Sequence, residues 1–415
     1  MSVLFLHHRG SLADTPYHRW TREAGGGPPL LLTSREHLER EDEQLPLAEG
    51  YRYVEALDGY DSTGRLEARV LDLARDLRVR RLVACHERDL QRAARLRQIL
   101  GLPGPRPQSL LPCDDRLVLK ERARAAGLAT SPGQAVDSAT DVLTFAARHG
   151  FPLLLRPRRP EAAGASRLIA SRAELTAWLD DDAGPHRPGL MVQALPVGRR
   201  YQVHGLLLGG RAVLTWPSDR VSRRVGGLDW TTETTLSPNH PLTLALLERT
   251  ERLVAVLPSG PAHVIRADFV RTPLGLVLLD LVDGIGPDAG RGLCRAALGV
   301  DPAEALARVQ LGLEPRSTGP DRPLRIAARL TLVRPAGAVR ALPGPPPFPW
   351  VDRFRTHVDR SLRLNGPADA TDFAVSAYVT APGRTLCFSR LRLLERWIGH
   401  GLELDRSESG YGARL

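Results

Sequence analysis

The chain has 415 residues, of which 42% are hydrophobic and 25% are charged, as is usual for a soluble globular protein. That length exceeds a single hydrophobic core, so we expect two or three packed units. A net charge of +10 would suit a nucleic-acid partner, but Lys120 is the only lysine and the arginines are spread evenly, without a basic tail. We therefore interpret most arginines as solvated surface and do not expect nucleic acid as a partner.

We expect neither a signal peptide nor a membrane-spanning segment. The first apolar run, Val3–Leu6, is short and is followed at once by His7 and His8. No later run approaches the ~18 apolar residues that a membrane helix needs. The cysteines show no CxxC spacing, which argues against a disulfide framework or a zinc site. We expect a cytoplasmic protein with no membrane partner. The four cysteines are Cys85, Cys113, Cys294 and Cys387.

Strand and helix patterns alternate through the first hundred residues. This alternation predicts a parallel sheet with right-handed crossovers, a Rossmann-like unit over residues 1–108. His7 and His8 follow the first strand, at the edge where such sheets bind ligands, so they could contact a second substrate or be incidental. The strand-like runs are Val3–Leu6, Pro29–Thr33, Tyr51–Ala56 and Arg81–Ala84, and the helical ones are Arg65–Arg75 and Leu90–Leu100.

A second unit is expected over residues 109–192. Asp114 or Asp115 is placed to cap a helix that Gly127 ends. The elements expected after it are a helix at Ala139–His149, a strand at Pro152–Pro157, a turn at Arg158–Arg167, a strand at Leu168–Ser171 and a helix at Arg172–Asp180.

The pattern becomes strand-rich from Leu190 onward. We assign residues 193–318 to a third unit and residues 319–415 to a C-terminal lid or hairpin region. The third unit's expected strands are Leu190–Leu195, Tyr201–Leu208, Ala212–Trp216, His263–Val270 and Gly275–Leu281, with a helical insertion at Pro238–Leu257. In the last region, Pro343–Pro349 predicts a stiff loop, and Ala374–Thr380 with Thr385–Phe388 predicts a terminal hairpin.

Three local patterns, in this order and spacing, resemble the ATP-grasp superfamily of the carboxylate–amine ligase type over nearly the whole chain. They run from Cys85 to Gly104 and on through Asp114–Leu128, along Phe151–Pro157, and from His263 to Pro273 with Leu278–Asp280. The resemblance implies mixed α/β and α+β architecture: a Rossmann-like N-terminal parallel sheet followed by two ATP-grasp lobes that clamp ATP. It also implies ATP and Mg²⁺ as cofactors, and a small carboxylate and an amine as substrates.

The resemblance implies a phosphate-binding role for Arg116, Lys120 and Arg156. The family usually has lysine where Arg116 and Arg156 stand, and arginine can hold phosphate through its planar fork. Lys120 is alternatively a surface helix residue. The loop containing Gly164 and Ser166 resembles the flap that covers the phosphates, although a plain surface turn is an equal alternative.

Metal ligation is implied for Asp268 and Asp280, where the family generally has glutamates. Two oxygen ligands on adjacent strands suit Mg²⁺. The family's third ligand, an asparagine, matches Val282 here, so Asp283 could substitute, though on a regular strand it would face the other way. Alternatively, Asp268 is only the ion-pair partner of an arginine such as Arg266.

The nucleoside positions depart from the family, which commonly has acidic residues there. Gln193, Arg200 and His204 occupy these positions, and the main chain from Val192 to Leu195 could still bind adenine. As the resemblance implies, Arg266 would act in catalysis and Arg224 would hold a substrate carboxylate or an acyl phosphate. Arg224 belongs to a trio with Arg220 and Arg223, which we place in a loop and which could equally be solvated.

Two functional hypotheses follow. The first is an ATP-dependent ligase that joins a carboxylate to an amine through an acyl phosphate. The alternative is a degenerate ATP-grasp protein that binds a ligand or partner without ATP turnover, which the changed metal and ribose positions favour. A homodimer is an open alternative to a monomer.

Overall fold

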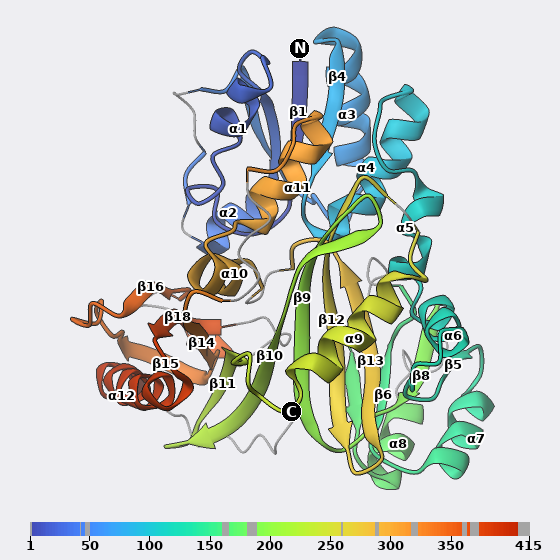
Figure 1. Cartoon of the computed structure of the whole chain (residues 1–415), viewed down its shortest axis with the longest axis vertical. Helices are drawn as coiled ribbons and strands as arrows, with labels where there is room; N and C mark the ends of the chain where they lie inside the picture. The colour runs from blue at the N-terminus through green and yellow to red at the C-terminus, as the bar shows by residue number, and fades with distance from the viewer. Residues whose placement is uncertain are drawn as a thin grey trace.

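The computed structural model describes residues 2–41, 43–45, 50–159, 166–180, 189–258, 260–286, 290–316, 323–358, 363–365 and 373–405, which form four sheets (Figure 1). Among these residues no helix combines the length and apolar character that crossing a membrane requires. The arrangement agrees with the expected mixed α/β architecture of a parallel N-terminal sheet followed by antiparallel sheets.

The N-terminal sheet is parallel and has the strand order β3-β2-β1-β4, as the alternating pattern predicts. One face packs against α3 and α4, burying Leu4 and Leu30, and the other packs against α1 and α11, burying Phe5 and Leu31. Its elements are β1 (Ser2–His7), α1 (Tyr17–Glu23), β2 (Leu30–Ser34), α2 (Arg35–Glu41), β3 (Tyr53–Leu57), α3 (Arg65–Asp76), β4 (Val79–Ala84) and α4 (Glu87–Leu100).

The small sheet has four strands in the order β5-β8-β6-β7 and pairs antiparallel throughout. Its outer face is covered by α7 and α8, whose Phe145 and Trp178 are buried against it. The predicted boundary between residues 192 and 193 falls inside β8. The elements are α5 (Pro107–Asp114), α6 (Arg116–Ala125), β5 (Gly133–Val136), α7 (Ala139–His149), β6 (Leu153–Pro157), β7 (Arg167–Ile169), α8 (Arg172–Leu179) and β8 (Leu190–Ala194).

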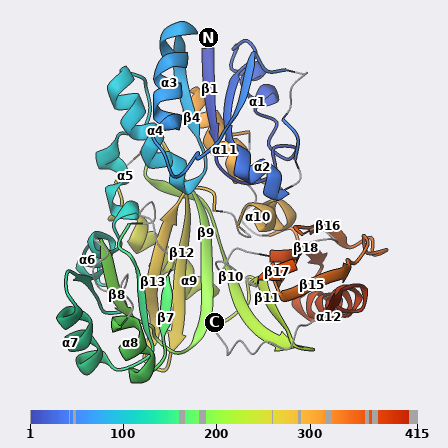
Figure 2. The same ribbon diagram turned by 180° about the vertical axis from the view of Figure 1, so that it is seen from behind.

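The large sheet has eight antiparallel strands in the order β13-β12-β9-β10-β11-β14-β18-β16, so the C-terminal region continues it (Figures 1 and 2). Helix α9 covers one face near β9 and β12, and α12 packs on β14 and β18. The elements are β9 (Arg199–Leu208), β10 (Arg211–Val225), β11 (Leu228–Thr235), α9 (Thr243–Val254), β12 (Ala262–Thr272), β13 (Gly275–Asp283), α10 (Gly290–Leu298), α11 (Pro302–Leu311), β14 (Ile326–Val333), β16 (Val351–Thr356), β18 (Phe373–Ala381) and α12 (Arg384–Gly401). A further small sheet joins β15 (Ala336–Ala341), β17 (Arg363–Asn365) and β19 (Glu403–Asp405).

Two sequence-based predictions about local structure are wrong. The expected terminal hairpin is not formed, because Thr385–Phe388 lies in the first turns of α12, whose Cys387 and Leu391 are buried against the sheet. The arginine trio does not lie in a loop, since β10 and β11 form one long hairpin that turns at Gly226 and Gly227.

Strand β13 connects the other parts of the molecule. Near its start, the Leu278 amide donates to the Ala129 carbonyl (2.8 Å), which attaches the segment leading to the small sheet. Beyond its end, the Ile285 amide donates to the Cys85 carbonyl (2.8 Å) at the edge of the N-terminal sheet. Gly284 makes this junction with φ at +103°, and a Cβ there would lie 2.7 Å from the Glu87 Cα.

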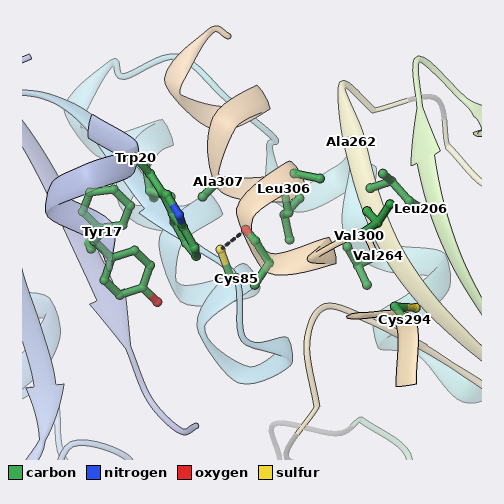
Figure 3. Close-up of a cluster of buried hydrophobic side chains, with 14 of the residues drawn as sticks. Tyr17, Trp20, Cys85, Leu206, Ala262, Val264, Cys294, Val300, Leu306 and Ala307 are labelled. Atoms are coloured by element: carbon green, nitrogen blue, oxygen red, sulfur yellow. Dashed lines mark hydrogen bonds between the residues drawn. The ribbon is translucent and has the colours of Figure 1, made fainter. Parts of the chain in front are cut away.

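The N-terminal sheet and the large sheet share one hydrophobic core. Figure 3 shows Tyr17 and Trp20 of α1 on one side of α11 and Leu206 and Val264 of the large sheet on the other. Helix α11 is defined locally by its Asp301 N-cap, a proline in its first turn and a left-handed glycine after its end. It lies far along the chain from β1, so residues from the predicted third unit complete the N-terminal one.

Candidate functional site

Three cations predicted to bind phosphate meet where the small sheet faces the large sheet. Arg116 opens α6, and its Nε lies 3.2 Å from Asp280 Oδ2 while its Nη1 donates to the Pro157 carbonyl (2.8 Å). Arg156 Nη2 donates to the same Asp280 oxygen at 2.6 Å. In β6, Leu153 and the alternate residues after it pack under α7 and α8, so period-2 alternation turns Arg156 to the opposite face.

Lys120 lies one helical turn after Arg116 and joins the same group. Its side chain is buried, and Nζ donates to Ser131 Oγ (2.8 Å) and to the Ser131 carbonyl (3.0 Å). The alternative of a surface helix residue is therefore wrong. Burial lowers the pKa of Lys120 to about 7, against the opposing charge of Asp280, so this ammonium titrates near neutrality.

Gln193 joins this group through Ser131. Its Nε2 donates to Ser131 Oγ (2.9 Å) and to the Leu279 carbonyl (3.3 Å). Gln193 Oε1 is buried and accepts no hydrogen bond from the part of the chain that the structure describes. The Leu195 amide donates to the Pro152 carbonyl (3.1 Å), so that main-chain donor is already used. We call Arg116, Lys120, Ser131, Arg156, Gln193 and Asp280 the inter-sheet cluster.

A β-bulge aims Asp280 into the inter-sheet cluster. In the β12–β13 register, Asp268 pairs with Asp280 and Phe269 with Leu278, so Leu279 has no cross-strand partner. Leu278 packs in the core under α9, and without the extra residue Asp280 would face that core as well. Burial by itself raises the pKa of Asp280, but the charges of Arg156 and Arg116 outweigh it and hold that pKa well below its usual range.

Asp268 and Arg266 lie one strand further along the large sheet, on the same face. Asp268 Oδ1 accepts from Gln202 Nε2 (2.7 Å) and lies 3.4 Å from Arg266 Nε. Asp268 is thus the ion-pair partner of Arg266 in this structure, as one of the alternatives expected. Because Asp268 is directly opposite Asp280, both carboxylates face the same side.

The structure does not bring the other predicted site residues into this cluster. Asp283 faces the opposite side of β13, with its Oδ2 2.7 Å from His263 Nδ1, which corrects its grouping with Asp268 and Asp280. Arg224 stands exposed near the tip of the β10–β11 hairpin, 3.9 Å from Asp229. Arg200 pairs in register with Arg220 and Val270 at the outer end of β9. Ser166 is exposed next to β7, and Gly164 lies outside the described residues.

His7 and His8 are buried, and their rings are engaged within the N-terminal unit. His7 Nδ1 is 2.9 Å from Tyr17 Oη, and its Nε2 is 2.8 Å from the Gly10 carbonyl. His8 pairs with Asp61 and lies 3.1 Å from His86 Nδ1. Their contacts give them a structural role.

A second polar group on the same face of the large sheet was not anticipated. Glu233 Oε1 accepts from Ser218 Oγ and from His204 Nε2, each at 2.7 Å. Because a carboxylate only accepts, His204 Nε2 carries a proton in this contact. His204 lies directly across from Arg266 in the β9–β12 register. Glu233 stands in an unbroken polar run, 231–235, which gives no periodic signal in the sequence.

His204 and Arg266 line a pocket under the start of α10. Val264, Val282 and Cys294 form part of its apolar wall. A Cβ on Gly290, which also lines it, would lie 2.5 Å from His204 Nδ1, so only glycine leaves this nitrogen room. The pocket has a volume of about 30 Å³, and Arg266 and His204 are among its polar lining residues.

The donors around Asp280 do not fit a metal ion held by the protein. Asp280 Oδ2 accepts from two guanidinium groups, and its Oδ1 accepts from the Leu281 amide (3.0 Å). Val282 offers no ligand atom where a third would be expected. Among the described residues, no group of three or more His, Cys, Asp or Glu side chains is arranged to hold a metal ion.

No protein-family model and no curated protein sequence matches this chain. Its structure is similar to an L-amino acid ligase from Bacillus licheniformis, with a TM-score of 0.74 and 12% identity over 98% of this chain and 99% of that one. It is also similar to N5-carboxyaminoimidazole ribonucleotide synthetase from Thermus thermophilus, with a TM-score of 0.65 and 17% identity over 98% and 100% of the two chains. A third match is the biotin carboxylase domain of Hydrogenobacter thermophilus 2-oxoglutarate carboxylase in complex with MgADP and bicarbonate (TM-score 0.69, 16% identity, 97% and 90% covered).

These full-length likenesses show that the chain has the ATP-grasp fold. The parallel N-terminal sheet, the small sheet and the large antiparallel sheet are the parts of that fold. At 10–17% identity they carry the fold alone, so the chemistry has to be argued from the side chains of this chain.

Proposed function

We propose that the chain is an ATP-dependent ligase that joins a small carboxylate to an amine through an acyl phosphate. The observation that carries this proposal is the convergence of Arg116, Lys120 and Arg156 on one side of β13, between the two sheets. Three cations, two from α6 and one from β6, suit a triphosphate, and the two arginines among them are permanently charged. Similar solved structures include an L-amino acid ligase, which supports this class of reaction.

The inter-sheet cluster also offers a nucleoside contact. Gln193 Oε1 is a buried acceptor with no hydrogen bond from the described residues, and an adenine amino group would satisfy it. Its Nε2 is already held by Ser131 and by the Leu279 carbonyl, so the acceptor is fixed in direction. Gln193 would then take the place of an acidic residue in recognising the base.

In the reaction, a carboxylate oxygen attacks the γ-phosphorus and ADP leaves. The amine nitrogen then attacks the acyl carbon, phosphate leaves and the amide forms. Arg266 would hold the carboxylate. His204 Nδ1 would take the proton that turns the ammonium form of the amine into the free nucleophile, while Glu233 holds the imidazole in the required tautomer, and the proton lost on amide formation would leave with phosphate. Positioning and charge neutralisation supply most of the acceleration in such transfers.

A second candidate is nucleotide binding without turnover. The observation that favours it is Asp280, whose oxygens are taken by Arg116, Arg156 and the Leu281 amide, with Val282 beside it. In that case ATP would stabilise a conformation of the chain and not be consumed.

Nucleotide turnover separates the two candidates. Purified protein is given ATP with Mg²⁺ and the common amino acids singly and in pairs, and ADP release is followed. The ligase predicts ADP release that depends on both an added carboxylate and an amine, and its loss in Arg156→Gln but not in the exposed control Arg148→Gln. ATP binding without any ADP release would favour the second candidate, and no ATP binding would contradict both.

A further inference from the structure

The hydrogen bonds of Asp280 indicate how phosphate charge is neutralised here. We infer that the guanidinium groups of Arg116 and Arg156 take the place of a protein-held divalent cation, so that the inter-sheet cluster binds polyphosphate without a metal ion. This inference rests on the proposed function for the identity of the ligand. It differs from that function in making Asp280 a counter-ion of two arginines and not a metal ligand.

The carboxylates that would hold a metal are already occupied. Asp280 Oδ2 accepts from Arg116 Nε (3.2 Å) and Arg156 Nη2 (2.6 Å), and its side chain is 6% exposed. Asp268 is matched by Gln202 and Arg266. A metal ion reaching Asp280 would have to displace two permanent cations and would then face both of them.

Both arginines are kept in the cluster by the elements that carry them. Arg116 is fixed by the Pro157 carbonyl (2.8 Å) and by its place at the start of a helix that Asp115 caps. Arg156 is held near the end of β6 by its pairing with Met191 of β8. Arg156 Nε is buried and donates to no group among the described residues, so a phosphate oxygen would satisfy it.

The charge balance of the site favours an anion even without a metal. Three cations lie on one side of β13 around the carboxylate of Asp280, namely Arg116, Arg156 and Lys120. The neighbouring pair of Arg266 and Asp268 is neutral as a unit. The excess positive charge therefore faces the space where the three cations meet, and guanidinium forks bind phosphate oxygens directly.

Calorimetry with two ligands tests the inference directly. ATP and inorganic triphosphate are titrated into the full chain, once with excess Mg²⁺ and once with EDTA. We expect both ligands to bind in EDTA, with dissociation constants within about threefold of those in Mg²⁺, a difference of less than about 0.7 kcal/mol. Binding of ATP that weakens more than about tenfold in EDTA would overturn the inference while leaving the proposed function standing. Absence of binding under both conditions would overturn both.

The Asp280→Asn variant gives an independent test, because the two interpretations predict opposite signs. If Asp280 is a counter-ion, removing its charge frees the arginines, and triphosphate should bind about tenfold tighter. If Asp280 is a metal ligand, Mg²⁺-dependent ATP binding should weaken. Should this variant fail to fold, Arg156→Gln replaces it: we expect equal loss of triphosphate affinity with and without Mg²⁺. A loss confined to the metal-free titration would contradict the inference.

Discussion

On the Lys120 ammonium, burial and the nearby charge of Asp280 shift the pKa in opposite directions. The ammonium is enclosed by Ser131 and by the side of β13, and burial brings its pKa from 10.5 down to about 7. The same Ser131 hydroxyl oxygen accepts a hydrogen bond from Gln193 Nε2, so Ser131 orients both the lysine ammonium and the glutamine amide. If the side chain of Lys120 or of Gln193 were removed, the other would keep its hydrogen bond to Ser131, whose hydroxyl would lose one of its two partners.

The lowered pKa of Lys120 makes a prediction about stability and pH. Between about pH 7 and 10.5 the unfolded chain carries a proton on this lysine that the folded chain does not, so its contribution to the free energy of unfolding rises with pH in that window. Each pKa unit of difference corresponds to about 1.4 kcal/mol. In Lys120→Met that part of the slope should disappear, as measured by urea unfolding across the window. An unchanged slope would contradict the assignment.

His204 makes a prediction about the nucleophile. The variant His204→Gln should lower the rate of amide formation with an ordinary amine by about 10²–10⁴-fold. It should leave ATP binding unchanged, because His204 lies outside the inter-sheet cluster. With hydroxylamine, which is already neutral at pH 7, hydroxamate formation should be nearly normal. Equal losses with both nucleophiles would indicate a structural role for this histidine.

At the scale of single elements, strand β13 shows what the sequence could and could not reveal. Its apolar run predicted a strand at Gly275–Leu281, and the structure confirms one at Gly275–Asp283. The bulge at Leu279 was not predictable, because it leaves no mark in the residue types and appears only in the register with β12. Because of that single extra residue, Asp280 points to the face of β13 on which Arg116, Lys120 and Arg156 lie.

The junction after β13 makes a prediction about packing. Gly284→Ala would put a Cβ 2.7 Å from the Glu87 Cα at a φ of +103°, so both the clash and the backbone strain act. We expect a loss of about 2–6 kcal/mol in the free energy of unfolding, each of the two effects costing about 1–3 kcal/mol. Gly209→Ala is the matched control: its φ is also positive, at +55°, but nothing lies within 4 Å. If both variants lost the same free energy of unfolding, the contact with Glu87 would contribute nothing to the loss.

At the scale of the whole molecule, α11 determines which parts can fold independently. The parallel sheet, the capped helix α6 and the strand carrying Arg156 were all predictable, because local periodicity and capping residues define them. The packing of α11 against α1 and β4 was not, because the partners lie some 200 residues or more apart in sequence (Figure 3). The polar group of His204, Ser218 and Glu233 was missed for a different reason: its members are close in sequence but meet only through the register of β9, β10 and β11. A homodimer and a cytoplasmic location stay predictions.

The shared core makes a prediction about fragments. A fragment of residues 1–108 would keep α1 but lose α11, so it would expose part of the sheet face that buries Val3, Phe5 and Leu31. We expect this fragment to lack a cooperative unfolding transition and to aggregate, since its remaining core is too small. Circular dichroism and sedimentation measure this. A monomeric fragment with a sharp transition would show that the unit is autonomous.

The central claim is that the inter-sheet cluster binds the phosphates of ATP, and a titration of the wild-type chain and of Arg156→Gln with ATP tests it most directly. The account predicts micromolar-scale binding by the wild type, on the order of −8 kcal/mol, and a loss of about tenfold or more in Arg156→Gln, with Arg148→Gln unchanged. ATP binding that is the same in all three proteins would contradict it.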